Sequence, residues 1–209
     1  MEACLSYLEE VGSPLDSYEV ILVDDGSSDG TREACESLEP LRYIRHEQTL
    51  GQSAALERGF REARGTYVVS LDGDGQNDPA DIPVLLGHLV EHGLDCVCGW
   101  RVHRNDPLGK RVASRGAYIL RQAIVRDGIH DSGCTLKAFR RECLEGLPLE
   151  DGWHRFIPAL LKQRGYSVGE IPVNHRPRLH GRSKDGPSRM AKGLRDLIAI
   201  GATPTGSTS

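Results

Sequence analysis

Two carboxylates separated by a single residue, Asp72 and Asp74, form the part of this sequence best suited to hold a divalent cation. The glycines beside them let the backbone bend tightly around one ion, and Gln76 could add a carbonyl oxygen. Magnesium keeps few protein ligands and takes the rest from water and substrate phosphates, so the loop suits a metal that binds together with a nucleotide. The alternatives are a turn that is polar only because it is a loop, and an EF-hand, which fails because its sixth position would be Asn77 instead of Gly.

A second acidic loop, at residues 24–30, follows an earlier apolar run in the same way. Its first two carboxylates, Asp24 and Asp25, could accept hydrogen bonds from a nucleobase or a ribose. Asp29 is better explained as the N-cap of a helix that begins near Thr31, a role that does not account for the other two. The sequence therefore places two groups of acceptors, each directly after an apolar run.

The elements that carry these loops alternate as strand, loop and helix with a period of about 25 residues, which predicts an α/β fold with a mostly parallel sheet and helices on both faces. Strands are expected at 18–23, 41–45, 66–71, 95–98, 136–139 and 167–171. Helices are expected at 1–10, 31–38, 52–64, 81–92, 108–125 and 153–164. Both acidic loops then lie at the carboxyl ends of strands, where open α/β sheets place their binding crevices.

Five segments resemble, in this order, the motifs of the family 2 inverting nucleotide-sugar glycosyltransferases: 23–31, 51–56, 71–79, 131–141 and 178–184. They are most similar to the branch of dolichol-phosphate mannosyltransferase-like enzymes. The resemblance implies the Rossmann-like GT-A fold and transfer of a sugar from a nucleotide-diphosphate sugar, either GDP-mannose or a UDP-sugar. It implies a polyprenyl or dolichyl phosphate as the first choice of acceptor, a glycan as the second, and Mg²⁺ or Mn²⁺ as the cofactor.

The resemblance also implies a role for each matching residue. The residues implied on the donor are Asp24, Asp25, Gln52, Asp72, Arg178 and Lys184, and those implied on the metal are Asp72, Asp74 and Gln76. Asp131 is implied at the acceptor, as the catalytic residue. Because an acceptor phosphate is already anionic and needs no strong general base, Asp131 would orient groups instead of removing a proton; its alternative role is to cap a loop.

Charge is distributed unevenly along the chain. Residues 1–150 hold 16 Lys and Arg against 26 Asp and Glu, whereas residues 151–209 hold 10 against 4. The basic end indicates an anionic partner such as a phosphate group or a lipid surface. Met190, Leu194, Leu197 and Ile198 recur at helical spacing, so residues 186–202 are expected to form a basic amphipathic helix that lies on a membrane surface or packs on the domain. Nucleic acid is not an expected partner, because aromatic residues make up only 5% of the chain.

We expect residues 1–185 to form the catalytic domain and residues 203–209 to be a disordered tail. Members of the resembled family begin with an apolar strand that lies between the strands corresponding to 18–23 and 66–71, and this sequence shows no such strand. The chain is therefore expected to be a fragment or to have a misplaced start, and a nucleotide-sugar-binding fragment without turnover is the alternative function. Since neither a signal peptide nor a membrane span is predicted, the expected location is the cytoplasm or the cytoplasmic face of the membrane.

Two weaker patterns have ordinary explanations. His88 and His92 match the HxxEH spacing of one class of zinc proteases, but a charged helix surface explains them better. The six cysteines form no CxxC pair, so we expect reduced thiols.

Overall fold

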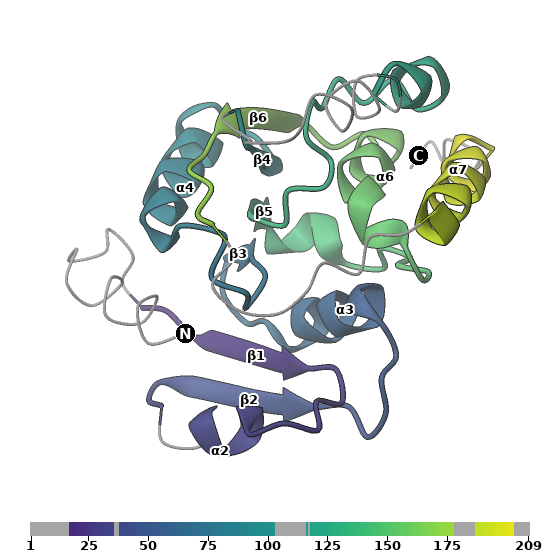
Figure 1. Ribbon diagram of the computed structural model, residues 1–209. Helices are drawn as coiled ribbons and strands as arrows, with labels where there is room; N and C mark the ends of the chain where they lie inside the picture. The colour runs from purple at the N-terminus through teal and green to yellow at the C-terminus, as the bar shows by residue number, and fades with distance from the viewer. Residues whose placement is uncertain (1–16, 36–37, 103–115, 117, 178–186, 203–209) are drawn as a thin grey trace.

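Two separate sheets organise the part of the chain that the structure describes, which comprises residues 17–35, 38–102, 116, 118–177 and 187–202. Figure 1 shows this computed structural model, with the smaller, two-stranded sheet below the larger one. The α/β fold class predicted from the sequence is confirmed.

The smaller sheet consists of β1 (Val20–Asp24) and β2 (Leu41–Arg45), which pair in parallel. Parallel strands need a crossover connection, and α2 (Thr31–Cys35) lies in it. The next helix, α3 (Gln52–Glu62), packs against β1. The acidic loop at 24–30 therefore leaves the carboxyl end of β1, as predicted.

The larger sheet has four strands in the order β3 (Tyr67–Ser70), β5 (Lys137–Arg140), β4 (Cys96–Trp100) and β6 (Val168–Pro172). β4 and β6 are parallel, whereas β5 runs antiparallel to both of its neighbours. Hydrophobic periodicity carries no information about strand direction, which is why the sequence did not predict the reversed β5.

Helices cover both faces of the larger sheet, as Figure 1 shows. α4 (Ile82–Glu91) contacts β4 and β5 on one face, and α6 (Ile157–Gln163) contacts β4 and β6 on the other. Successive side chains of a strand point to opposite faces, so Cys96 and Cys98 pack in the α6 core and Val97 packs in the α4 core. A strand buried on both faces reads as a continuous apolar run, which is how β4 was recognised.

The two sheets share no hydrogen-bonded strand within the described residues. Each of β1 and β3 pairs on one side only, and no described strand lies between them, which is where the family resemblance places a central strand. α3 links the two halves, because it contacts β1 and also the short 3₁₀ helix η3 (Trp153–Phe156) that precedes α6.

Two expected helices differ from the structure at their ends or lie partly outside it. The helix expected at 153–164 is divided into η3 and α6, because Pro158 lies in the first turn of α6, where a residue without an N–H starts a helix instead of continuing one. Of the helix expected at 108–125, the described residues 116 and 118–124 are helical. The helix expected at 1–10 lies outside the described residues.

The last helix, α7 (Pro187–Gly201), packs on the domain through its second half. Leu197 and Ile200 are buried in the same core as α6, while Ile198 is 57% exposed. None of the described helices has the length and apolar content that crossing a bilayer requires.

Candidate active site

The loop that follows β3 holds the two carboxylates predicted to bind metal. The Asp72 Oδ1 atom accepts a hydrogen bond of 2.8 Å from Nε2 of Gln52, the first residue of α3. Burial and the neighbouring charge of Asp74 raise the pKa of Asp72, and they outweigh the hydrogen bond from Gln52. Asp74 in turn accepts a 3.1 Å bond from the backbone N–H of Gln76. The structure therefore brings Gln52, predicted to contact the donor, into contact with the loop that carries Asp72, Asp74 and Gln76.

This donor set fits a hard divalent cation that shares its coordination with a ligand. Two carboxylates and one amide oxygen are too few to complete a magnesium shell, and the described residues include no cluster of three or more His, Cys, Asp or Glu able to hold a metal ion. Water or phosphate oxygens would have to supply the remaining positions. A cation would also relieve the repulsion between Asp72 and Asp74 that raises the pKa of Asp72.

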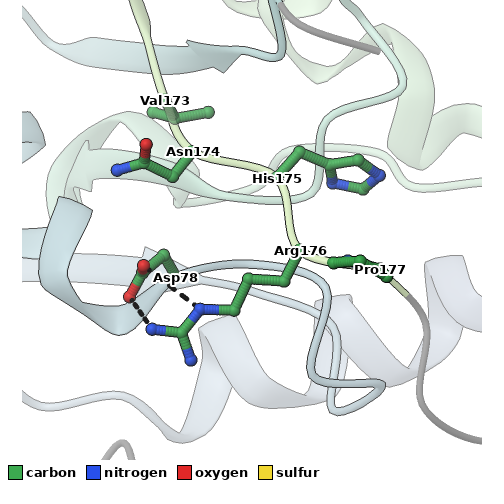
Figure 2. A pocket seen from close by; sticks show the side chains of 6 residues that line it. All are labelled: Asp78, Val173, Asn174, His175, Arg176 and Pro177. Carbon is green, nitrogen blue, oxygen red and sulfur yellow. Dashed lines mark hydrogen bonds and ion pairs between the residues drawn. The ribbon is translucent and has the colours of Figure 1, made fainter. Parts of the chain in front are cut away.

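The segment after β6 is fastened to the acidic loop by two paired contacts. Asp81 is 8% exposed and accepts bonds of 2.8 Å from both the backbone N–H and the side-chain amide of Asn174. Asp78 accepts from Nε and Nη2 of Arg176 at 3.2 and 2.7 Å, as Figure 2 shows. These contacts border a pocket of about 370 Å³, which is lined by Asp78, Val173, Asn174, His175, Arg176 and Pro177.

His175 lies against the loop at 72–78, which is predicted to bind metal. Its Nε2 atom is 3.4 Å from Nε2 of Gln76, and its backbone forms an isolated β-bridge with Asn77. The backbone N–H of Arg176 completes the junction by donating to the Gln76 carbonyl at 2.9 Å. The described segment after β6 ends at Pro177, and Arg178 follows it in the sequence. The two predicted phosphate-binding residues, Arg178 and Lys184, lie outside the described residues.

Asp24 is committed to contacts within the protein. It is 5% exposed and accepts from the backbone N–H of Ser27 at 2.8 Å and from the Tyr43 hydroxyl. Burial alone would raise the pKa of Asp24, but these hydrogen bonds and the charge of Arg45 lower it overall. The hydrogen bond from the Tyr43 hydroxyl to Asp24 raises the pKa of Tyr43 to about 12. The geometry gives Asp24 a role in shaping the loop, and its donor contact stays a prediction.

Asp25 ties the end of β1 to the start of α3. Its oxygens accept from the backbone N–H groups of Leu50 at 2.9 Å and Gly51 at 2.8 Å, and the Nδ1 atom of His46 lies 2.9 Å away. Burial opposes ionisation, but these bonds outweigh it and lower the pKa of Asp25. Because Gly51 immediately precedes Gln52, Asp25 helps to place the side chain that bonds to Asp72. Its predicted contact with the donor base stays a prediction.

Asp131 forms a two-pronged ion pair with Arg101, which directly follows β4. Nε of Arg101 donates to Oδ2 at 2.7 Å and Nη2 donates to Oδ1 at 2.9 Å. Burial would lower the pKa of Arg101, but Asp131 raises it above its usual range, and the charge of Asp72 adds to this effect. Arg101 and Asp131 are therefore electrostatically coupled to the loop at 72–76.

Several residues of the site escaped the sequence analysis. Lys137 on β5 is 3% exposed, donates to the Cys134 carbonyl, and its charge favours ionised Asp72. Arg101 carried a usable signal, because it leaves the carboxyl end of a strand as the two acidic loops do. Lys137 lies inside a matched segment, but neither periodicity nor the resemblance assigned it a role.

The histidine pair on α4 has the features of an ordinary helix surface. The rings of His88 and His92 stack with centroids 4.0 Å apart, and Nδ1 of His92 lies 3.0 Å from the His88 carbonyl. Neither residue belongs to a group of three metal-ligating side chains within the described residues.

Comparison with known proteins identifies relatives of the chain. The model of the family described as Glycosyl transferase family 2 matches residues 2–147. Dodecaprenyl-phosphate galacturonate synthase of Rhizobium johnstonii is 37% identical, over 92% of this chain and 61% of that protein. Undecaprenyl-phosphate 4-deoxy-4-formamido-L-arabinose transferase of Yersinia pestis is 35% identical, over 87% of this chain and 57% of that protein. The chain thus spans less than two thirds of the length of these curated relatives.

Solved structures share the fold. Glucosyl-3-phosphoglycerate synthase from Mycobacterium tuberculosis in complex with phosphoglyceric acid superposes with a TM-score of 0.71 at 22% identity, over 97% of this chain and 76% of that one. The same enzyme in complex with Mn²⁺, UDP-glucose and phosphoglyceric acid gives a TM-score of 0.68 at 22% identity, over 99% of this chain and 76% of that one. At this level of identity the likeness establishes the architecture alone.

Proposed function

Because the chain belongs to glycosyl transferase family 2, we propose that it transfers a sugar from a nucleotide-diphosphate sugar to a polyprenyl phosphate. The observation that carries the proposal is the cluster at the end of β3, where Gln52 of α3 holds Asp72, and Asp74 accepts a hydrogen bond from the backbone of Gln76. The printed names of the two curated relatives, both of which contain a polyprenyl phosphate, support the choice of acceptor.

On the donor side, Asp72, Asp74 and Gln76 would hold Mg²⁺ or Mn²⁺. When bound, the cation would neutralise charge that develops on the leaving diphosphate. The crystal structure of the mycobacterial synthase with Mn²⁺ and UDP-glucose supports this pairing of metal and donor. The contacts of Asp78 with Arg176 would keep the segment leading to Arg178 beside the same loop.

On the acceptor side, Arg101 would supply a fixed positive charge for the incoming phosphate. A phosphate oxygen would attack the anomeric carbon while the bond from that carbon to the diphosphate oxygen breaks, which inverts the configuration and releases the nucleoside diphosphate. No proton has to be removed from an ionised phosphate. Both oxygens of Asp131 are engaged by Arg101, so Asp131 would orient that guanidinium. A lipid-borne acceptor also implies contact with the cytoplasmic face of a membrane.

The test is sugar transfer from labelled UDP- and GDP-sugars to undecaprenyl phosphate, with and without Mn²⁺. We expect metal-dependent transfer that falls by more than about 100-fold in the double variant Asp72→Asn, Asp74→Asn, because neutralising the leaving group contributes several kcal/mol. Asp29→Asn is the matched control, since Asn caps a helix as well as Asp does. Unchanged activity and metal dependence in the double variant would refute the proposal, and metal-dependent donor binding without transfer would reduce it to a binding function.

A further inference from the structure

Glu170, on β6, holds the loop that carries Asp131. Its side chain is 7% exposed, and its two oxygens accept three hydrogen bonds from two consecutive residues. Oε1 accepts from the backbone N–H of Asp131 at 2.9 Å, and Oε2 accepts from the backbone N–H of His130 at 2.9 Å. Nδ1 of His130 lies 2.8 Å from the same Oε2. A single carboxylate therefore fixes both the main chain of 130–131 and the His130 ring.

The His130 ring is also held from its faces. Its centroid lies 4.5 Å from the Trp100 ring and 5.5 Å from the Tyr118 ring, and the planes are nearly parallel, at 16° and 6°. Trp100 is the last residue of β4, so the stack joins the loop to the strand that precedes Arg101. The loop is thus restrained by hydrogen bonds from β6 and by stacking on β4.

The restraint passes to Arg101 through Asp131. With the Asp131 main chain fixed, its carboxylate accepts from Nε and Nη2 of Arg101, and Oδ2 also lies 3.3 Å from the Arg101 backbone nitrogen. A guanidinium has five N–H groups in one plane, and two of them are used here. The other three make no hydrogen bond to the described part of the chain, so the plane set by Asp131 decides where they point.

We propose that Glu170 is a positioning residue, which fixes the 130–131 loop and thereby aims the free N–H groups of Arg101 at the acceptor phosphate. The identity of that anion rests on the proposed function, whereas the placement of Arg101 does not. Glu170→Gln has nearly the same shape but replaces one accepting oxygen by an NH₂ group, so it cannot accept all three bonds. The 130–131 loop should then open more often, and the Arg101 side chain with it.

The experiment measures Arg101 directly by NMR of the ¹⁵N-labelled protein. The Nε–H resonance of Arg101, assigned by its loss in Arg101→Lys, should exchange slowly with water in the wild type and about tenfold faster in Glu170→Gln. The Nε–H of Arg140, which donates to the Leu94 carbonyl at 3.1 Å, is the internal reference for an intact fold and should not change. Glu145→Gln is the matched control, because it removes the same charge from a side chain that is 71% exposed.

A second variant covers the case in which Glu170→Gln fails to fold. His130→Phe keeps the stack and the backbone bond but loses the side-chain bond to Glu170, and it should accelerate Arg101 exchange by a smaller factor. Unchanged Arg101 exchange in a folded Glu170→Gln protein, or in His130→Phe if that alone folds, overturns the proposal.

Kinetics then test the consequence for the acceptor. In Glu170→Gln we expect the KM for undecaprenyl phosphate to rise about tenfold, with the KM for the donor unchanged, because a misaimed guanidinium weakens the charged hydrogen bonds to the acceptor. An equal rise in both KM values would overturn the aiming of Arg101 at the acceptor. If the wild type transfers no sugar, but Glu170→Gln still exchanges its Arg101 Nε–H faster, the positioning role stands and the proposed function is refuted. The two failures are therefore distinguishable.

Discussion

The two carboxylates at the carboxyl end of β1 have different hydrogen-bond partners although they are adjacent in sequence. Asp24 and Asp25 are adjacent, yet the first is closed in by Tyr43 and Ser27 while the second accepts the N–H groups that lead into α3. Each therefore has its pKa lowered by hydrogen bonds that form only in the folded protein. A carboxylate of this kind stabilises the fold wherever it is ionised.

Asp25→Asn should lower the free energy of unfolding at pH 7 by about 2 kcal/mol, because two N–H groups lose a charged acceptor. The folded pKa of Asp25 lies below its ordinary value of 3.8. The contribution is therefore complete above pH 3.8 and declines as the pH falls through the folded pKa. Urea unfolding of the wild type and the variant at pH 7 and near pH 2 measures this. A difference that stays constant or grows in acid would contradict the assignment.

At the scale of elements, the segment after β6 is held by two contacts, one to the buried carboxylate of Asp81 and one through the exposed side chain of Arg176. Asp81 is 8% exposed and satisfies both the main chain and the side chain of Asn174. The Arg176 side chain, bound to Asp78, is 51% exposed. Solvent screens an exposed ion pair, whereas a buried carboxylate that loses a donor carries the desolvation penalty of its charge. The two contacts should therefore differ in strength although their distances are alike.

Asn174→Ala is expected to destabilise the protein by about 2 kcal/mol, since it leaves the buried carboxylate of Asp81 without its side-chain donor. Arg176→Gln should cost less than about 1 kcal/mol. Chemical denaturation of both variants compares them directly. Equal losses would mean that burial does not decide the strength of this junction.

The sequence predicted elements more fully than it predicted contacts. β2 was predicted with the bounds that the structure has, Leu41–Arg45. The reversed direction of β5 could not be read, since a period of two is the same in both directions. The loop at 72–76 was singled out because its two carboxylates are close in sequence, and its role in metal binding stays a prediction. The Arg101 and Glu170 contacts were missed because they join residues 30 and 40 positions away from their partners.

At the scale of the whole molecule, α3 joins the smaller sheet to η3, which packs with the larger sheet's α6. Ser53, on α3, makes polar contacts with η3 and with the residue before it. Its hydroxyl, 1% exposed, accepts from the backbone N–H groups of Gly152 at 3.1 Å and His154 at 3.2 Å and lies 3.0 Å from the His154 ring. The strands β1 and β2 are only partly buried, unlike the central β4. The smaller sheet should therefore open at a lower free energy than the core.

Ser53→Ala should destabilise the protein by about 1–2 kcal/mol, because it leaves the partly buried N–H groups of Gly152 and His154 without their acceptor. Hydrogen exchange should show that β1 and β2 lose protection before β4 does, and that the variant widens this difference. Ser28→Ala, at an exposed position in the loop after β1, is the control. Uniform exchange across both sheets would contradict this view of the molecule.

Within the described residues β1 and β3 each pair with one strand only, which bears on how molecules of this protein meet one another. An uncovered strand presents a row of backbone donors and acceptors that a strand of a second molecule can satisfy without any side-chain match. Self-association should accordingly be promoted by concentration and resist added salt, since backbone hydrogen bonds carry no net charge to screen.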